Sequence, residues 1–129
     1  MNTLPPAIVL IENDEVTLEL YQRELRKSFT VFAFTELEGV LEVIAKQDIQ
    51  VVVIEPEGHS GKGWDLIHSI HLTNPDRAIS VIVCSTRDSN DKDQTHEVNK
   101  YLTKPVLPRT LREETLGIIR DLERPRRIS

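Results

Sequence analysis

The sequence predicts an α/β protein in which helices cover both faces of a five-stranded parallel sheet. Three uninterrupted apolar runs, residues 7–11, 51–54 and 81–84, have the composition of strands that are buried on both faces. The segments between these runs carry apolar residues at helical spacing, so strands and helices alternate along the chain. Such alternation is typical of a three-layer, doubly wound architecture.

The first unit begins with the strand at residues 7–11. Asp14 follows it and is suited to cap a helix over residues 15–27, because its side chain can accept from the free backbone N–H groups of the first turn. The apolar positions of this helix include Val16, Leu20 and Leu25.

The second unit consists of a short strand at residues 29–34 and the helix that follows it. Thr35 and Glu38 have the spacing of a capping box, which predicts that the helix begins at this point. Its apolar side chains are expected on one face, and they are Leu37, Val40, Leu41 and Ile44.

The third strand ends at Glu55, and a glycine-rich loop over residues 58–63 follows it. A helix is expected to begin at Trp64 and to end near Asn74, because Pro75 restricts the residue before it and cannot continue a helix. The loop contains Ser-Gly-Lys-Gly, but it lacks the full phosphate-loop pattern and does not follow the first strand. We therefore interpret it as an ordinary flexible loop.

The fourth strand, residues 81–84, ends at Ser85, and the fifth is expected at residues 100–103. Pro108 is suited to the first position of a final helix, where its missing N–H costs nothing. The side chains at helical spacing in that helix are Leu111, Thr115, Ile118, Ile119 and Leu122.

The segment between the last two strands differs from the others. Residues 87–99 contain one apolar side chain, Val98, so they offer no stripe that could pack a helix against the sheet. The helix at this place is therefore expected to be short, displaced or disordered.

Length and charge limit the organisation of the chain. Its 129 residues, with ordinary apolar and charged fractions, predict one domain over residues 7–122, between a tail at 1–6 and a basic tail or linker at 123–129. The net charge of −5 argues against nucleic-acid binding by this domain. The basic residues near the end, which we interpret as solvated, are Arg120, Arg124, Arg126 and Arg127.

The single cysteine, Cys84, falls inside a predicted buried strand and has no partner for a disulfide. No apolar stretch approaches the ~20 residues of a membrane span, and the amino terminus lacks the pattern of a signal peptide. These features predict a cytoplasmic protein without a membrane partner.

Polar residues stand where the predicted strands end. The triplet Glu12-Asn13-Asp14 follows the first strand, Glu55 the third, Ser85 the fourth, and Lys104 the fifth. Because the carboxyl ends of parallel strands meet at one edge of a sheet, these groups are expected in one crevice.

On these residues the chain resembles the receiver domain of two-component response regulators, over residues 7–122. That family has a flavodoxin-like fold with strand order 2-1-3-4-5, an acidic pair after the first strand, an aspartate acceptor of phosphate, a Ser or Thr, and a Lys-Pro whose peptide bond is cis. The positions that match here are Glu12, Asn13, Glu55, Ser85, Lys104 and Pro105, with Gly63 in the loop and Tyr101 on the fifth strand.

The resemblance implies a Mg²⁺ site made of Glu12, Asn13, Glu55 and the backbone carbonyl of Glu57. Mg²⁺ prefers carboxylate oxygens, and Asn13 is a neutral amide at the usual ligand position. Asp14 is not expected to replace it, because successive side chains point in different directions. At most weak Mg²⁺ binding and no other cofactor are predicted.

Glu55 is longer than the aspartate of the family by one methylene, about 1.5 Å. A misplacement of ~1 Å can cost on the order of 10²-fold in a reaction that depends on positioning. The longer carboxylate is expected to reach Lys104 and Ser85, either imitating a phosphoryl group or forming a buried ion pair with the lysine. The alternatives are a solvated loop acid for Glu55 and a turn cap for Ser85.

Three functions follow from these expectations. The first is a pseudo-receiver that is not an enzyme and signals by protein–protein interaction, with a histidine kinase, an effector domain or a second copy of itself as partner. The second is a competent receiver that takes phosphate from a histidine kinase onto Glu55 or a nearby acid. The third is a flavodoxin-like domain that binds a small molecule in the crevice, although Glu12-Asn13-Asp14 would repel an anion there.

The four histidines give a weaker signal. His68 and His71 are three residues apart on a predicted helix and could share a metal, but the sequence offers no third ligand at a suitable spacing. His59 and His96 are predicted to be loop residues.

Overall fold

The computed structural model describes residues 4–86 and 97–123. The expectation of a short or disordered helix before the fifth strand falls mostly on residues 87–96, and the basic tail falls on 124–129, so both lie outside the described residues. The elements, in chain order, are β1 (Ala7–Ile11), α1 (Glu15–Leu25), β2 (Thr30–Phe34), α2 (Val40–Lys46), β3 (Ile49–Ile54), α3 (Gly63–Thr73), β4 (Ser80–Ser85), β5 (Lys100–Thr103) and α4 (Pro108–Glu123).

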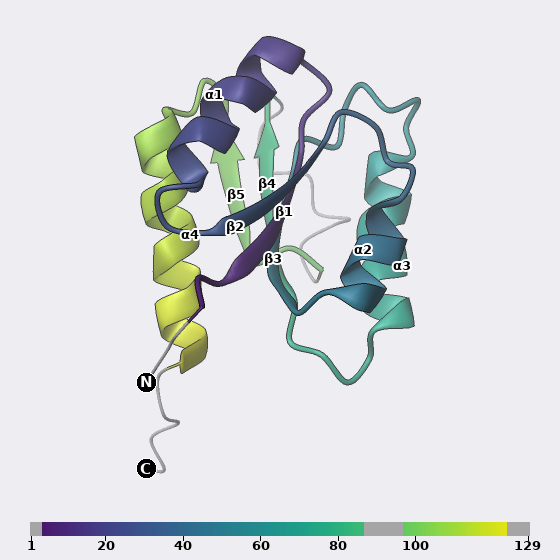
Figure 1. Cartoon of the computed structure of the whole chain (residues 1–129). Coiled ribbons are helices and arrows are strands. Elements are labelled where there is room, and N and C mark those ends of the chain that lie inside the picture. The colour runs from purple at the N-terminus through teal and green to yellow at the C-terminus, as the bar shows by residue number, and fades with distance from the viewer. Residues whose placement is uncertain (1–3, 87–96, 124–129) are drawn as a thin grey trace.

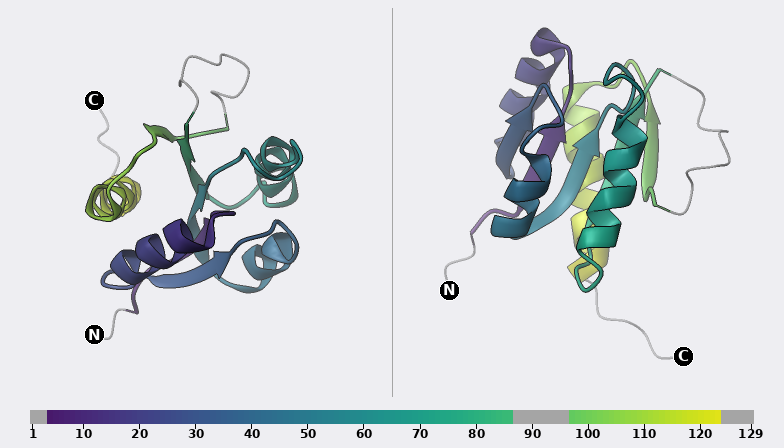
Figure 2. Two further views of the ribbon diagram at one scale, coloured as in Figure 1. Left: turned by 90° about the horizontal axis from the view of Figure 1, so that it is seen from above. Right: turned by 90° about the vertical axis from the view of Figure 1, so that its right-hand side faces the viewer.

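The five strands form one parallel sheet in the order β2-β1-β3-β4-β5. Helices α1 and α4 lie on one face, and α2 and α3 lie on the other, as Figure 1 and the view from above in Figure 2 show. The predicted three-layer fold and its strand order are therefore confirmed. None of the helices in the described ranges is both long and apolar enough to cross a lipid bilayer.

Alternate residues of the inner strands supply two separate cores. Ile8 and Leu10 of β1 pack on the side of α1 and α4, whereas Val9 and Ile11 pack on the side of α2 and α3. The same alternation holds in β3 and β4, so the inner strands are buried on both faces. Each fully buried side chain of this size contributes about 1.5–3 kcal/mol to folding, which holds the strand ends in fixed positions.

Most predicted boundaries agree with the structure to within two residues, but the start of α2 does not. The helix begins at Val40, and residues 35–39 form bends and a turn in place of the predicted capping box. Gly39 has a φ of 86°, which a right-handed helix cannot contain, so the helix can begin only after it. Leu41 is consequently exposed while Val40 and Ile44 are buried.

Helix α1 is capped by Asp14 as predicted, but two of its three predicted apolar positions face solvent. Leu25 is fully buried, whereas Val16 is 70% exposed and Leu20 is 49% exposed. A helical spacing of apolar residues thus located the helix correctly and overstated how much of it packs against the sheet.

Candidate functional site

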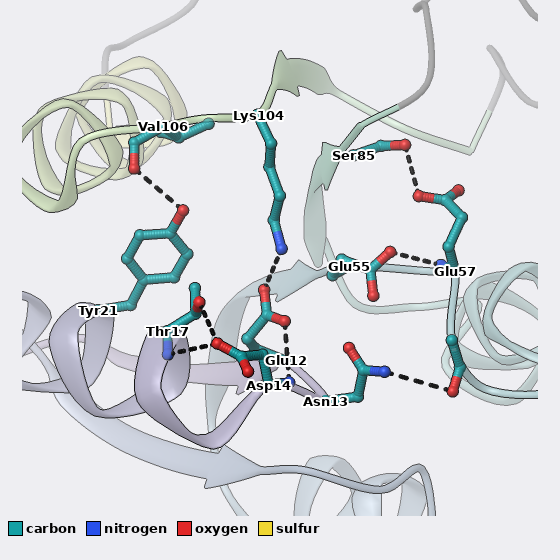
Figure 3. A network of polar contacts seen from close by, with 11 residues as sticks. Glu12, Asn13, Asp14, Thr17, Tyr21, Glu55, Glu57, Ser85, Lys104 and Val106 are labelled. Carbon is teal, nitrogen blue, oxygen red and sulfur yellow. Dashed lines mark hydrogen bonds and ion pairs between the residues drawn. The ribbon is translucent and has the colours of Figure 1, made fainter.

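The strand ends meet at one edge of the sheet. The backbone N–H groups of Glu12, Glu55 and Lys104 each donate to a carbonyl at the end of the neighbouring strand, at 2.8 to 3.0 Å. These bonds extend the ladder one residue beyond each strand, which fixes the starting point of each polar side chain. Glu12, Glu55 and Lys104 therefore lie at one edge of the sheet together with Ser85, and Figure 3 shows their contacts.

Lys104 forms an ion pair with Glu12. Its Nζ lies 2.5 Å from Glu12 Oε1, and the side chains are 17% and 2% exposed. The other oxygen of Glu12 accepts from the backbone N–H of Asp14 at 3.1 Å. The expected pair between Lys104 and Glu55 is therefore wrong, because the buried acid at the end of β1 holds the lysine. We call Glu12 and Lys104 the charge-paired half of the crevice.

Asp14 acts as the N-cap of α1 and not as a member of the crevice. Its Oδ2 accepts from the backbone N–H of Thr17 at 3.0 Å and from the Thr17 hydroxyl at 2.5 Å. These two bonds, the hydroxyl first, hold the pKa of Asp14 below its ordinary value of 3.8. The expectation that Asp14 would not replace Asn13 agrees with this orientation.

Glu55 is buried at the end of β3, with 7% of its surface exposed, so the solvated-loop alternative is wrong. Its Oε2 accepts from the backbone N–H of Glu57 at 2.8 Å. The side chain of Glu57 turns toward β4, where its Oε1 accepts from the Ser85 hydroxyl at 2.5 Å (Figure 3). We call Glu55, Glu57 and Ser85 the acidic half of the crevice.

The environment of Glu55 favours its protonated form. The pKa of Glu55 is raised to about 7, first by burial and then by a hydrogen bond with the Glu57 side chain and by the nearby Glu57 charge. The Glu57 N–H and the more distant Lys104 oppose this shift without cancelling it. Two neighbouring carboxyl groups at this depth are most stable when Glu55 carries a proton.

Two of the residues implied as holders of Mg²⁺, Glu12 and Asn13, make contacts within the protein. Both oxygens of Glu12 are occupied, and the Asn13 amide lies against Gly58, donating to its carbonyl at 3.5 Å. A Cβ on Gly58 would come within 2.2 Å of Asn13 Nδ2, so the amide fills this space. Across residues 4–86 and 97–123, no three His, Cys, Asp or Glu side chains are arranged to hold a metal.

Two glycines shape the loop between β3 and α3. Gly58 has a φ of 84°, which favours glycine. Gly63 lies so close to the preceding chain that a Cβ would come within 2.3 Å of the Pro56 carbonyl oxygen. The segment predicted to be a simple flexible loop is thus tightly folded at both ends.

Tyr101 and Pro105 occupy the positions that the resemblance implied. The half-buried Tyr101 ring lies 6.4 Å from the ring of Trp64 at the start of α3, with an interplanar angle of 38°. The peptide bond between Lys104 and Pro105 is cis.

Sequence reasoning missed three polar contacts. It considered only the backbone of Glu57, although an acid two residues after Glu55 and beyond a proline could have indicated a second carboxylate. Glu97 contacts both helical histidines, with His68 Nδ1 2.9 Å from its carboxylate and His71 Nε2 2.9 Å from its backbone oxygen. The Tyr21 hydroxyl donates to the Val106 carbonyl at 3.0 Å, and burial raises the pKa of Tyr21 to about 12.

A pocket of about 440 Å³ lies beside Lys104, between α1 and the segment that joins β5 to α4. Leu20, Tyr21 and Val106 give it a largely apolar lining. It lacks the Thr- or Ser-rich first loop that would mark a phosphate-binding flavodoxin-like site, because Glu12-Asn13-Asp14 stands there instead.

Comparison with known proteins identifies the fold. No protein-family model matches the chain, and no curated protein sequence matches it. A CheY-like response regulator receiver domain from Methanospirillum hungatei JF-1 superposes with a TM-score of 0.78 at 18% identity, covering 92% of this chain and 97% of that one. A response regulator from Thermotoga maritima gives 0.73 at 23% identity, covering 91% and 99%.

A CheY-like receiver domain from Methylobacillus flagellatus gives a TM-score of 0.77 at 15% identity, covering 88% of this chain and 98% of that one. The strand order of the sheet and the cis peptide bond between Lys104 and Pro105 are the two features that the resemblance to receiver domains predicted. The chain therefore has the fold of response regulator receiver domains along nearly its whole length.

Proposed function

We propose that this chain is a receiver-like module of two-component signalling that acts through protein–protein contacts and does not pass through a phosphorylated state. In this proposal Glu55 stands in the place of the phosphate-accepting aspartate. The fold and the order of polar residues at the strand ends support the receiver-like part. The contacts within the crevice support the absence of phosphorylation.

The ion pair between Lys104 and Glu12 is the observation that carries the proposal. In a receiver, the lysine would have to meet an incoming phosphoryl group, which requires a cation that is free to move. Here the ammonium group is held at 2.5 Å by an acid that is 2% exposed, and breaking such a pair leaves an uncompensated buried charge. Phosphoryl transfer depends on a well-positioned nucleophile and on stabilisation of the transferred charge. In this site the nucleophile position holds the longer Glu55, and the lysine is already paired with Glu12.

The state of Glu55 supports the same function. A protonated carboxyl group is a poor nucleophile, and the raised pKa of Glu55 keeps a large fraction of it protonated near neutral pH. The occupied oxygens of Glu12 and the amide of Asn13 would leave Mg²⁺ weakly bound or unbound. The partner of such a module would be a signalling protein, a histidine kinase or an effector domain.

The test is intact mass spectrometry after incubation with Mg²⁺ and acetyl phosphate. We expect no phosphoryl adduct on the native chain, because neither the nucleophile nor the lysine is available. Glu55→Asp is treated in parallel, and Glu113→Asp serves as a matched control because Glu113 is an exposed acid on α4.

An adduct on Glu55→Asp alone would mean that the crevice can still act on phosphate and that Glu55 blocks it. An adduct on no variant would mean that the lysine and metal positions are also unsuitable. A hydroxylamine-sensitive adduct on the native chain would contradict the proposal and favour the second function, a receiver phosphorylated by a histidine kinase.

A further inference from the structure

The loop that joins β3 to α3 contacts three other parts of the molecule. Near its start, the Glu57 side chain accepts from Ser85 at the end of β4. At its middle, Gly58 lies against Asn13 of the loop after β1. Beyond its end, Trp64 packs beside Tyr101 of β5. The loop and the start of α3 therefore contact the loop after β1, the end of β4 and a side chain of β5.

Of these three contacts, the bond between Ser85 and Glu57 is the shortest hydrogen bond. Its oxygen–oxygen distance of 2.5 Å is typical of a hydroxyl that donates to a charged carboxylate, which is roughly twice as strong as a neutral bond. Ser85 is 5% exposed and Glu57 is half-buried, so water competes little for either partner. The Asn13 contact, at 3.5 Å, is much weaker.

The geometry at Glu57 also differs from that of an ordinary loop acid. Its second oxygen, Oε2, is buried, and the only other side-chain hydrogen bond of Glu57 among the described residues is with the Glu55 carboxyl group, which donates when it carries its proton. Burying a carboxylate in this way is unfavourable unless another interaction compensates for it. The Ser85 hydroxyl provides compensation from the β4 side, whereas Glu36 and Glu38 of the facing loop stay exposed.

We infer that the Glu57 carboxylate is an internal anionic ligand of Ser85 that fastens the β3–α3 loop to the end of β4. The inference rests on the proposed function, a module that is not phosphorylated. In such a module the conformation of the loop is set by a carboxylate of the chain and not by an added phosphoryl group. Glu57, and not Glu55, then accepts the hydrogen bond from Ser85 that a phosphoryl group would accept in a phosphorylated receiver. Removing the Glu57 carboxylate releases the loop.

Trp64 provides the readout. It is the only tryptophan of the chain, and its side chain lines a small pocket together with Pro56 and Glu57. Its emission therefore reports on the loop without a label.

The experiment is a double-mutant cycle of Glu57→Ala and Ser85→Ala, with unfolding in urea and Trp64 emission of the folded state as measurements. We expect the two substitutions to be coupled by at least about threefold in the equilibrium constant of unfolding, because the second one removes a bond that the first has already broken. Both single variants and the double variant are expected to share one shifted Trp64 emission spectrum.

Two further variants separate the bond from general structural damage. Ser85→Thr keeps a hydroxyl and is expected to retain the native emission, and Glu113→Ala removes an exposed acid of α4 and is expected to leave the emission unchanged. Independent effects of the two alanine substitutions, or native emission in Glu57→Ala, would overturn the inference, as would a Ser85→Thr spectrum like that of Ser85→Ala. A phosphoryl adduct on the native chain would overturn the proposed function and leave the result of the cycle unchanged, so the two failures can be told apart.

Discussion

The two halves of the crevice treat buried charge in opposite ways. In the charge-paired half, the carboxylate of Glu12 meets the ammonium group of Lys104 directly. In the acidic half, Glu55 and Glu57 face each other without a cation as near, and a serine hydroxyl and a raised pKa of Glu55 relieve the repulsion. Lys104 pairs with Glu12 and therefore does not neutralise Glu55 directly. Glu55 consequently keeps a raised pKa and is largely protonated near neutral pH.

The largest expected effect comes from removing the cation. Lys104→Met leaves the Glu12 carboxylate buried without its partner, which is expected to cost about 3–5 kcal/mol of unfolding free energy. The measurement is urea unfolding at pH 7.

The pair between Lys100 and Glu114 provides a matched control for this experiment. Its side chains are 42% and 32% exposed, so Lys100→Met should cost under about 1 kcal/mol. The double variant Lys104→Met with Glu12→Gln should recover much of the loss, because no buried charge remains. Equal costs for the two lysine substitutions would show that the halves do not differ as described.

Glu55→Gln is expected to change the free energy of unfolding by a smaller amount, and the change should depend on pH. The pKa of Glu55 rises from 4.5 to about 7 on folding, so the folded protein binds more protons than the unfolded chain between these values. Its contribution to stability is fully present below pH 4.5 and is lost as the pH rises through 7. At pH 8 the variant should therefore be more stable than the native chain, by at most about 3 kcal/mol.

Thermal unfolding between pH 4 and pH 8 checks this prediction, with Glu113→Gln as a control on an exposed acid. At pH 4, the native chain and Glu55→Gln should have similar stability, since both then carry a neutral side chain at position 55. A native stability that does not fall between pH 4.5 and 7 relative to the variant would contradict the raised pKa.

The third prediction concerns the loop that carries the acidic half. Gly63→Ala places a Cβ within 2.3 Å of a backbone oxygen, which is expected to destabilise the fold by about 1–3 kcal/mol. Gly117→Ala is the matched change, because a Cβ there meets nothing within 4 Å, and it should stabilise α4 by about 0.5–1 kcal/mol. Urea unfolding measures both, and a tolerated Gly63→Ala would show that the loop can relax.

The sequence predicted the fold well because its strongest signals are local and repeated. Uninterrupted apolar runs located β1, β3 and β4, and Pro108 marked the start of α4. The start of α2 was predicted wrongly because Thr35 and Glu38 have the spacing of a cap, whereas the conformation of Gly39 depends on tertiary packing that no local pattern contains.

For the crevice, the sequence predicted which residues would meet but not how they would pair. Placing Glu12, Glu55, Ser85 and Lys104 at one edge needs only the order of parallel strands. Choosing between two acids for one lysine needs distances of a few ångströms and the relative burial of the acids, which are properties of the folded chain. For the same reason the Glu57 side chain, which crosses to another strand, could not be assigned a role from its position in the loop.

The buried thiol of Cys84 in β4 can be used to measure how often the folded protein opens. The thiol is 1% exposed, and burial raises its pKa to about 12, so in the folded state it is neither accessible nor ionised at neutral pH. A thiol reagent can reach it only when the core between the sheet and helices α1 and α4 opens. The labelling rate of the unmodified protein therefore reports how often this core opens, in the absence of denaturant and at any pH where the reagent works.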